Sequence, residues 1–201
     1  MINELINSNA HILVAGATGS GKSVIINKFI KESGSKFDLF LIDPKRVELF
    51  EYRKNGNVLF YADNTRKYIK ALSWAEEILS MRLKIMQFQR VKTWVGKPIY
   101  IVIDEFADLI HTSKDFANWI IKIAQLGRAA KVFLLLATQR ATANVINGSI
   151  KVNCDYRIAL HVPTAQDSRN IIGQSGAEKL PRYGKALLYS PDGLKEYEIR
   201  L

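Results

Sequence analysis

The sequence predicts an α/β fold in which a mostly parallel central sheet carries helices on both faces. One observation is the alternation along the chain of short apolar runs with amphipathic segments of helical spacing. A second is that residues 99–103 (IYIVI) and 132–137 (VFLLLA) are apolar throughout, which is typical of parallel strands buried between two helical layers. The length of 201 residues suits one domain, which we expect to span residues 1–201.

Each expected element follows from its own pattern. The strands are apolar runs separated by polar, glycine-containing or proline-containing segments, and the helices carry apolar residues three and four positions apart. The expected strands cover residues 11–15, 37–42, 57–61, 99–103, 132–137, 156–162, 185–189 and 196–201. The expected helices cover residues 23–32, 65–89 and 115–130.

The composition excludes several classes of protein. Hydrophobic residues make up 48% of the chain, enough to bury a core, so disorder is excluded as the main state. A single cysteine, Cys154, excludes a disulfide scaffold and a cysteine zinc site. No apolar run reaches the roughly 18 residues that span a bilayer, and the polar N-terminus is unlike a signal peptide. We therefore expect a cytoplasmic protein with no direct membrane span.

The charge is strongly positive. Lysine and arginine number 29 against 19 acidic residues, a net charge of +10. Such an excess favours an anionic partner, and nucleic acid is the commonest one. A solvated helix face is the alternative explanation, because residues 61–100 hold much of the excess in a segment that is largely helical in pattern.

Residues 16–23 (GATGSGKS) match the phosphate-binding pattern G-x-x-x-x-G-K-[ST]. Glycines allow the backbone N–H groups to turn towards phosphate oxygens, and the helix that follows directs its positive end at them. We expect Lys22 to contact the β and γ phosphates and the Ser23 hydroxyl to bind Mg²⁺. The expected contacts with ATP come from Gly16, Ala17, Thr18, Gly19, Ser20, Gly21, Lys22 and Ser23.

An acidic pair, Asp104 and Glu105, follows the strand expected at residues 99–103. A carboxylate at the carboxyl end of a strand can hold Mg²⁺ opposite the phosphate loop, and its neighbour can act as the general base for an attacking water. The pair therefore predicts ATP hydrolysis with Asp104 on the metal and Glu105 as base. The alternative for Glu105 is a charge that neutralises a helix N-terminus.

Gln139 follows the strand expected at residues 132–137. If that strand lies between the strands ending at Ala15 and Ile103, Gln139 is near the γ phosphate, where it can orient the attacking water. The alternative is a polar loop residue.

These elements together resemble the FtsK/SpoIIIE family of double-stranded DNA translocases, in the wider HerA–FtsK group. The resemblance covers residues 9–189 in the family's order and rests on several motifs. They include HILVAGATGSGKSVIIN, LIDPKRVEL, MRLKIM, IYIVIDEFADL, IAQLGRAAKVFLLLATQR and DSRNIIGQSGAEKL.

The resemblance implies a RecA-like phosphate-loop ATPase core that works as a homo-oligomeric ring, usually a hexamer, around duplex DNA. It implies that Arg128, in the motif GRAA, is an arginine finger that reaches the ATP of the neighbouring subunit; a helix C-terminal charge is the alternative. Arg82 is a weaker candidate for a contact in trans. Arg140, Arg169 and, more loosely, Lys151 are implied as contacts to DNA phosphates in the pore.

The same resemblance implies that Asp43 and Lys45 shape the nucleotide site or its interface, without a chemical step. The chain departs from the family pattern at three places. Ala141 replaces a usual proline, Ala165 replaces a common lysine, and residues 87–97 form a shorter loop than in larger members. The resemblance covers the motor core only.

Three functions remain open from the sequence. The leading one is an ATP-driven translocase or packaging motor for duplex DNA. A second is a secretion ATPase of the type VII kind, which moves polypeptides on the same fold. The third is an assembly or regulatory module that hydrolyses ATP slowly.

Overall fold

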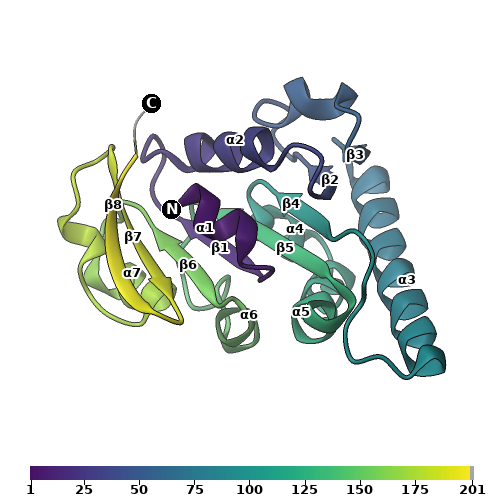
Figure 1. Ribbon diagram of the computed structural model, residues 1–201. Helices are drawn as coiled ribbons and strands as arrows, with labels where there is room; N and C mark the ends of the chain where they lie inside the picture. The colour runs from purple at the N-terminus through teal and green to yellow at the C-terminus, as the bar shows by residue number, and fades with distance from the viewer. Residues whose placement is uncertain (200–201) are drawn as a thin grey trace.

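The computed structural model describes residues 1–199, apart from the side chains of His111 and Lys114. Within these residues eight strands form one sheet (Figure 1). Its spatial order is β3 (Val58–Ala62), β2 (Asp38–Ile42), β4 (Ile99–Ile103), β5 (Val132–Thr138), β1 (Ile12–Ala15), β6 (Tyr156–Ala159), β7 (Lys185–Ser190) and β8 (Gly193–Glu198). In this spatial order the first six strands, from β3 through β1 to β6, pair in parallel. At the other edge β7 pairs antiparallel with β6 and with β8. The expected α/β fold with a mostly parallel sheet is confirmed.

Helices cover both faces of the sheet (Figure 1). One face carries α1 (Ile2–Asn7), α2 (Lys22–Ser33) and the 3-10 helix η1 (Phe50–Lys54). The other carries α3 (Thr65–Gln89), α4 (Phe106–Thr112), α5 (Lys114–Ala130), α6 (Gly148–Asn153) and α7 (Ala165–Ile172), with the 3-10 helix η2 (Ala177–Lys179). Because successive strand residues point to opposite faces, β1 contributes Ile12 and Val14 to the first core and Leu13 and Ala15 to the second.

The long helix α3 has clear end signals. The Asn64 side chain accepts a hydrogen bond from the backbone of Lys67 at 3.1 Å, which caps the N-terminus. Arg90 ends the helix in the left-handed conformation, with φ of 56°. The free end of α3 projects from the sheet at the lower right of Figure 1.

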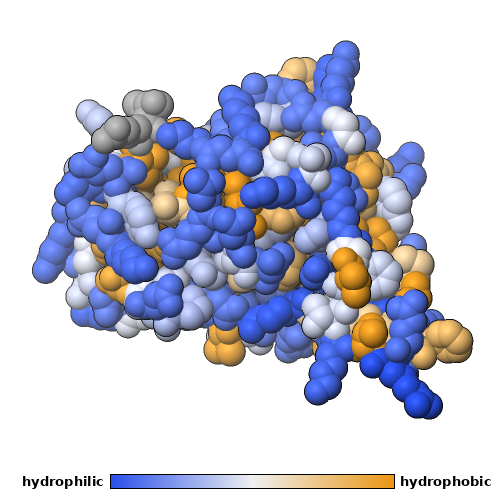
Figure 2. Space-filling model, in the orientation of Figure 1, coloured by the Kyte–Doolittle hydropathy of each residue, from blue (hydrophilic) through white to orange (hydrophobic). Residues whose placement is uncertain are grey.

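The surface is mainly hydrophilic in the view of Figure 2, as the high charge predicts. Apolar side chains are nevertheless exposed near the free end of α3, where Phe88 is 90% and Val95 86% exposed. Among residues 1–199 no helix combines the length and hydropathy needed to cross a membrane.

Some expected elements differ from the structure. The short helices α1, α4, α6 and α7 were not expected, because each has eight residues or fewer and too few turns for a readable periodicity. The strand expected to continue to residue 162 ends at Ala159. The last strand lies at Gly193–Glu198 rather than 196–201, and residues 200–201 lie outside the described part of the chain.

Candidate nucleotide site

The phosphate-loop sequence lies between β1 and α2, at the carboxyl edge of the parallel strands. Gly19 and Gly21 have φ of 75° and 107°, a region that glycine enters without a side-chain clash. A Cβ on Gly16 would stand 2.5 Å from the Cβ of Leu160, so this position also needs glycine. The loop is thus shaped by backbone conformations and a close approach that its glycines permit.

Lys22 opens α2 and points into the loop. Its Nζ donates hydrogen bonds to the carbonyl oxygens of Gly16 at 2.7 Å and Ala17 at 3.1 Å. Burial lowers the pKa of the Lys22 ammonium to about 8, and the Lys45 charge acts in the same direction, while Glu105 opposes it. An ammonium group held by carbonyl dipoles alone in a largely buried place is stabilised by an incoming anion.

Asp104 is the residue after β4 and is only 4% exposed. Its Oδ2 atom is buried and has no hydrogen-bond partner among the described residues. Burial raises the pKa of the Asp104 carboxyl to about 6, and the charges of Glu48 and Asp43 add to that rise. A buried carboxylate oxygen without a partner is an unfavourable arrangement that a bound cation would relieve.

Glu105 is 3% exposed and occupies the position before α4. Its backbone is left-handed, with φ of 62°, which is uncommon for a residue with a side chain. The Glu105 carboxylate accepts a hydrogen bond from the Thr138 hydroxyl at 2.6 Å and from the Gln139 backbone N–H at 3.0 and 3.1 Å. Lys45 Nζ lies 3.4 Å from its Oε2. The side chain is therefore held over the end of β5 and does not cap its own helix.

The condition stated for Gln139 is met, because β5 lies between β4 and β1. Its side-chain Oε1 accepts a hydrogen bond of 2.6 Å from the hydroxyl of Thr18, in the phosphate loop. The Gln139 backbone is also bonded to Glu105. One residue thus connects the loop with the acidic pair.

A cavity of about 270 Å³ lies between these elements. It is lined by Thr18, Gly19, Gly21, Lys22, Ser23, Val24, Lys45, Glu48, Asp104 and Gln139. A phosphate loop, a buried lysine and two carboxylates converge on this one space, which fits a nucleoside triphosphate with a divalent cation.

Asp43 and Lys45 have different environments. Asp43 is fully buried, and its carboxylate accepts hydrogen bonds from the backbone N–H groups of Arg46 at 2.8 Å and Leu49 at 3.0 Å. Asp43 therefore folds the segment after β2, whereas Lys45 enters the cavity. Thr138 is a residue that the sequence reasoning missed, because a threonine that ends an apolar strand has no motif of its own.

Arg128 lies away from this cavity, in the last turn of α5 and before the start of β5. Its guanidinium is exposed and pairs with Asp155 at 2.6 Å. Because β5 runs from this edge of the sheet to the cavity, Arg128 and the phosphate loop are at opposite strand edges of one chain.

The expectation that Arg82 contacts a neighbouring subunit is wrong. Arg82 is 7% exposed, and its guanidinium donates to the carbonyl oxygens of Ala130 at 2.9 Å, Lys131 at 3.1 Å and Lys97 at 3.1 Å. Its Cζ also lies 4.9 Å from the centre of the Trp94 ring. All of these partners belong to the same chain, so the Arg82 guanidinium stabilises the interior of its own subunit.

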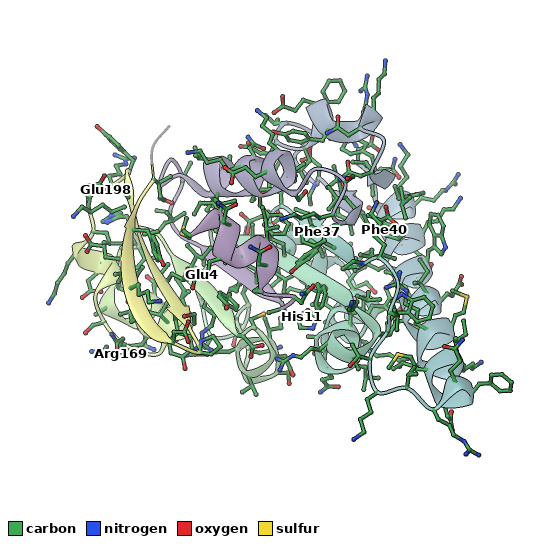
Figure 3. All side chains as sticks on the ribbon, viewed as in Figure 1. Glu4, His11, Phe37, Phe40, Arg169 and Glu198 are labelled. Atoms are coloured by element: carbon green, nitrogen blue, oxygen red, sulfur yellow. The ribbon has the colours of Figure 1, made fainter. Side chains whose placement is uncertain are left out.

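The three cations expected to contact DNA lie on segments that touch. The Lys151 Nζ donates a 2.6 Å hydrogen bond to the carbonyl oxygen of Arg169, whose side chain is exposed on α7 (Figure 3). Asn170, the next residue, donates to the carbonyl oxygen of Ala141 at 2.7 Å. The neighbouring Arg140 is exposed and lies 3.7 Å from Asp108. No described contact joins all three directly.

Comparison with known proteins places these features in context. The family model described as FtsK/SpoIIIE family matches residues 1–97. A protein named DNA translocase FtsK from Borreliella burgdorferi is 36% identical over 94% of this chain, which covers 27% of that protein. The chain spans about a quarter of the length of the curated relatives it matches.

Solved structures share the fold. The pCW3 conjugation coupling protein TcpA, in a monomer form with ATPγS, is 26% identical with a TM-score of 0.86, over 94% of this chain and 60% of that one. The cytoplasmic domain of the type VII secretion ATPase EccC from Thermomonospora curvata is 23% identical with a TM-score of 0.77, over 94% of this chain and 25% of that one. The second likeness concerns the fold alone.

Proposed function

This chain belongs to the FtsK/SpoIIIE family of phosphate-loop ATPases, and on that premise we propose that it is a motor that hydrolyses ATP to move double-stranded DNA through a ring of identical subunits. The observation that carries the proposal is the acidic pair: Asp104 lines the same cavity as the phosphate loop, and Glu105 is held beside Gln139, another residue of that cavity. Residues 1–201 form a single RecA-like motor domain in this proposal. Because ATP and DNA are both present in the cytoplasm, the motor works there.

The donor set fits Mg²⁺. Asp104 offers a buried carboxylate oxygen that has no hydrogen-bond partner among the described residues, and Ser23, which lines the same cavity, offers a hydroxyl. Hard oxygen ligands of this kind suit Mg²⁺, which also keeps several waters. When bound, the ion neutralises charge on the phosphate oxygens.

The protein's own groups have distinct roles in hydrolysis. The loop N–H groups and Lys22 hold the phosphates, and Gln139 orients the attacking water. Glu105 accepts a proton from that water as the oxygen bonds to the γ phosphorus and the bond to the ADP oxygen breaks. Lys45 places its ammonium group 3.4 Å from the Glu105 carboxylate.

Arg128 acts in trans in this proposal. It lies at the strand edge opposite its own phosphate loop, so a contact with ATP requires a neighbouring subunit. Its exposed guanidinium would exchange Asp155 for the phosphate of that neighbour, which adds positive charge where negative charge develops. A closed ring, with six subunits in the simplest case, gives every site one such arginine.

Duplex DNA is the proposed substrate of the ring. Arg140, Arg169 and Lys151 contact phosphates without reading bases, as movement along any sequence requires. The curated relatives at 36–39% identity are named DNA translocases, whereas the likeness to the type VII secretion ATPase is at 23% identity. This difference favours DNA over polypeptide.

The test is the steady-state rate of ATP hydrolysis with Mg²⁺, with and without long duplex DNA. We expect duplex DNA to stimulate the rate several-fold, and Glu105→Gln to lower it by about 10² or more because the base is lost. Lys22→Ala sets the background. Glu196→Gln, an exposed change in β8, is the matched control.

Two results would contradict the proposal. A wild-type rate no higher than that of Lys22→Ala would leave only an assembly module. Hydrolysis that ignores DNA, together with no salt-sensitive binding of short duplexes, would favour polypeptide transport.

A further inference from the structure

We propose that Thr138 is a positioning residue that connects DNA contact at Arg140 to the orientation of Glu105. The proposal rests on the function above, in which Glu105 is the base and Arg140 contacts DNA. It adds a residue to which the phosphate-loop and acidic motifs give no role, and it assigns a physical route from the DNA-contacting segment to the hydrolysis site.

The first observation is a chain of two hydrogen bonds through one buried hydroxyl. Thr138 is fully buried. Its Oγ1 donates to Glu105 Oε1 at 2.6 Å and accepts from the backbone N–H of Arg140 at 2.9 Å. Because a hydroxyl has one proton, donation to Glu105 leaves only its acceptor side for Arg140, so the arrangement is complementary.

The second observation is how little else orients the Glu105 carboxylate. Apart from Thr138, its short contacts are the Gln139 N–H, at 3.0 and 3.1 Å, and the longer 3.4 Å contact with Lys45. Residues 138 and 139 thus supply the close contacts that orient the base. The Glu105 side chain makes no capping hydrogen bond to its own helix, so its close contacts come from the end of β5 and the next residue.

A second contact joins the Arg140 side chain to the helix that follows Glu105. The Arg140 guanidinium lies 3.7 Å from Asp108, in the first turn of α4, and Glu105 immediately precedes that helix. A DNA phosphate that binds Arg140 competes with Asp108 for the guanidinium. The Arg140 side chain then no longer pairs with the first turn of α4, the helix that Glu105 precedes.

The end of β5 and the segment after it are also hydrogen-bonded to the phosphate loop and to α7. The Thr138 carbonyl oxygen accepts a 3.3 Å hydrogen bond from the Gly16 N–H, at the start of the phosphate loop. The Ala141 carbonyl oxygen accepts from Asn170, the neighbour of Arg169. A shift of residues 138–141 on DNA binding therefore moves the base relative to the phosphates, and sub-ångström placement of a catalytic group has large effects on rate.

The test compares Thr138→Val with Thr138→Ser in this chain. Valine keeps the shape of threonine but loses the hydroxyl, and serine keeps the hydroxyl. We expect Thr138→Val to lower kcat in the presence of duplex DNA about tenfold or more and to reduce DNA stimulation to less than about twofold, with KM for ATP changed less than about threefold. Thr138→Ser should retain kcat and stimulation within about threefold. Thr142→Val, at an exposed threonine in the same loop, is the matched control.

Several outcomes separate this proposal from the proposed function. If the wild type is stimulated by DNA and Glu105→Gln is inactive, but Thr138→Val keeps wild-type kcat and stimulation, Thr138 has no such role and the motor stands. If Thr138→Val weakens binding of a fluorescent ATP analogue as much as it lowers kcat, its role is only structural. If Thr138→Val does not fold by circular dichroism, Thr138→Ala is measured against the same limits. Absence of Lys22-dependent hydrolysis in the wild type would overturn both.

Discussion

Lys22 and Arg82 are two buried cations at opposite edges of one sheet. Each side chain belongs to a residue that is 7% exposed, and each donates hydrogen bonds to backbone carbonyl oxygens. Lys22 lies at the carboxyl edge, in the phosphate loop. Arg82 lies near the other edge, where it contacts residues just before β4 and β5. By burial and hydrogen bonding alone the two are alike.

Their surroundings are different. Lys22 lines a cavity together with Asp104, whose buried Oδ2 has no hydrogen-bond partner in the described part of the chain. Arg82 has three carbonyl acceptors and the face of Trp94, and it does not line the nucleotide cavity. The difference teaches that a buried cation indicates a binding site only when the space beside it is open and the nearby charges are incompletely paired.

Lys22→Ala gives the largest expected effect on function. Hydrolysis should fall by about 10³ or more, because the phosphates lose their buried charge. The free energy of unfolding should change by less than about 1 kcal/mol, since water can reach the loop carbonyls and a costly buried ammonium is removed. Steady-state kinetics and chemical denaturation measure the two quantities. A loss of several kcal/mol in stability would make Lys22 a structural residue like Arg82.

Arg82→Met should show the reverse. The carbonyl oxygens of Ala130, Lys131 and Lys97 lose their donor, so we expect the free energy of unfolding to fall by about 2–4 kcal/mol. Nucleotide binding should change little, because the cavity lies at the other edge. Urea denaturation and titration with a fluorescent ATP analogue test the pair of expectations.

The control for that variant is Arg66→Met, which replaces an exposed arginine at the start of the same helix. It should change stability by no more than about 0.5 kcal/mol. Equal stability of the Arg82 and Arg66 variants would show that the carbonyl contacts contribute nothing, and the comparison of the two buried cations would lose its basis.

The same contrast explains what the sequence could predict. Lys22 could be identified because residues 16–23 form a contiguous phosphate-binding pattern. Asp104 and Glu105 could be identified because they directly follow an apolar strand. The interpretation of Gln139 depended on a strand order that the sequence left open, and the structure has that order. The role of Arg82 was misjudged, because its acceptors are backbone carbonyl oxygens 15 to 49 positions away in the chain. Every residue has such a carbonyl, so no residue type in the sequence indicates these contacts.

Thr138 was missed for a related reason. Its partners are Glu105, between β4 and α4, and the backbone of Arg140, so its role depends on which residues the fold brings together and not on its residue type. The helices α6 and α7 were missed because their stability comes from packing against β6, α5 and neighbouring loops, not from a long periodic face. The sequence therefore predicts sites that contiguous motifs define, but not hydrogen bonds between residues that are distant along the chain.

A third buried basic group, His11, extends the comparison to pH. It is fully buried before β1, and its Nδ1 accepts a 3.0 Å hydrogen bond from the Leu134 backbone. Burial lowers the pKa of His11 to about 3, and the Arg128 charge adds to the effect. Between the unfolded value near 6.5 and this folded value the unfolded chain binds more protons, so stability is lost as the pH falls through that window.

At the carboxyl edge of the sheet, Asp104 gives the opposite effect of pH on stability. Because the pKa of folded Asp104 is raised to about 6, the folded chain binds more protons between its ordinary value and pH 6, and acid favours folding there. The pH dependence of the free energy of unfolding contains contributions from both His11 and Asp104, so the wild-type curve alone does not separate them. A His11 variant does, because subtracting its curve from the wild-type curve removes the Asp104 contribution.

His11→Asn keeps a side-chain acceptor for Leu134 and removes the titration. At pH 7.5 we expect the variant to be less stable than the wild type, because the packing of the ring against Phe133 is lost. From pH 7.5 to 4.5 the wild type should lose about 2 kcal/mol more than the variant, so their denaturation curves converge. Parallel curves over that range would mean that His11 is not a buried neutral base. His11 would then not lower the free energy of unfolding in acid. The difference in pH dependence between the two edges of the sheet would come from Asp104 alone.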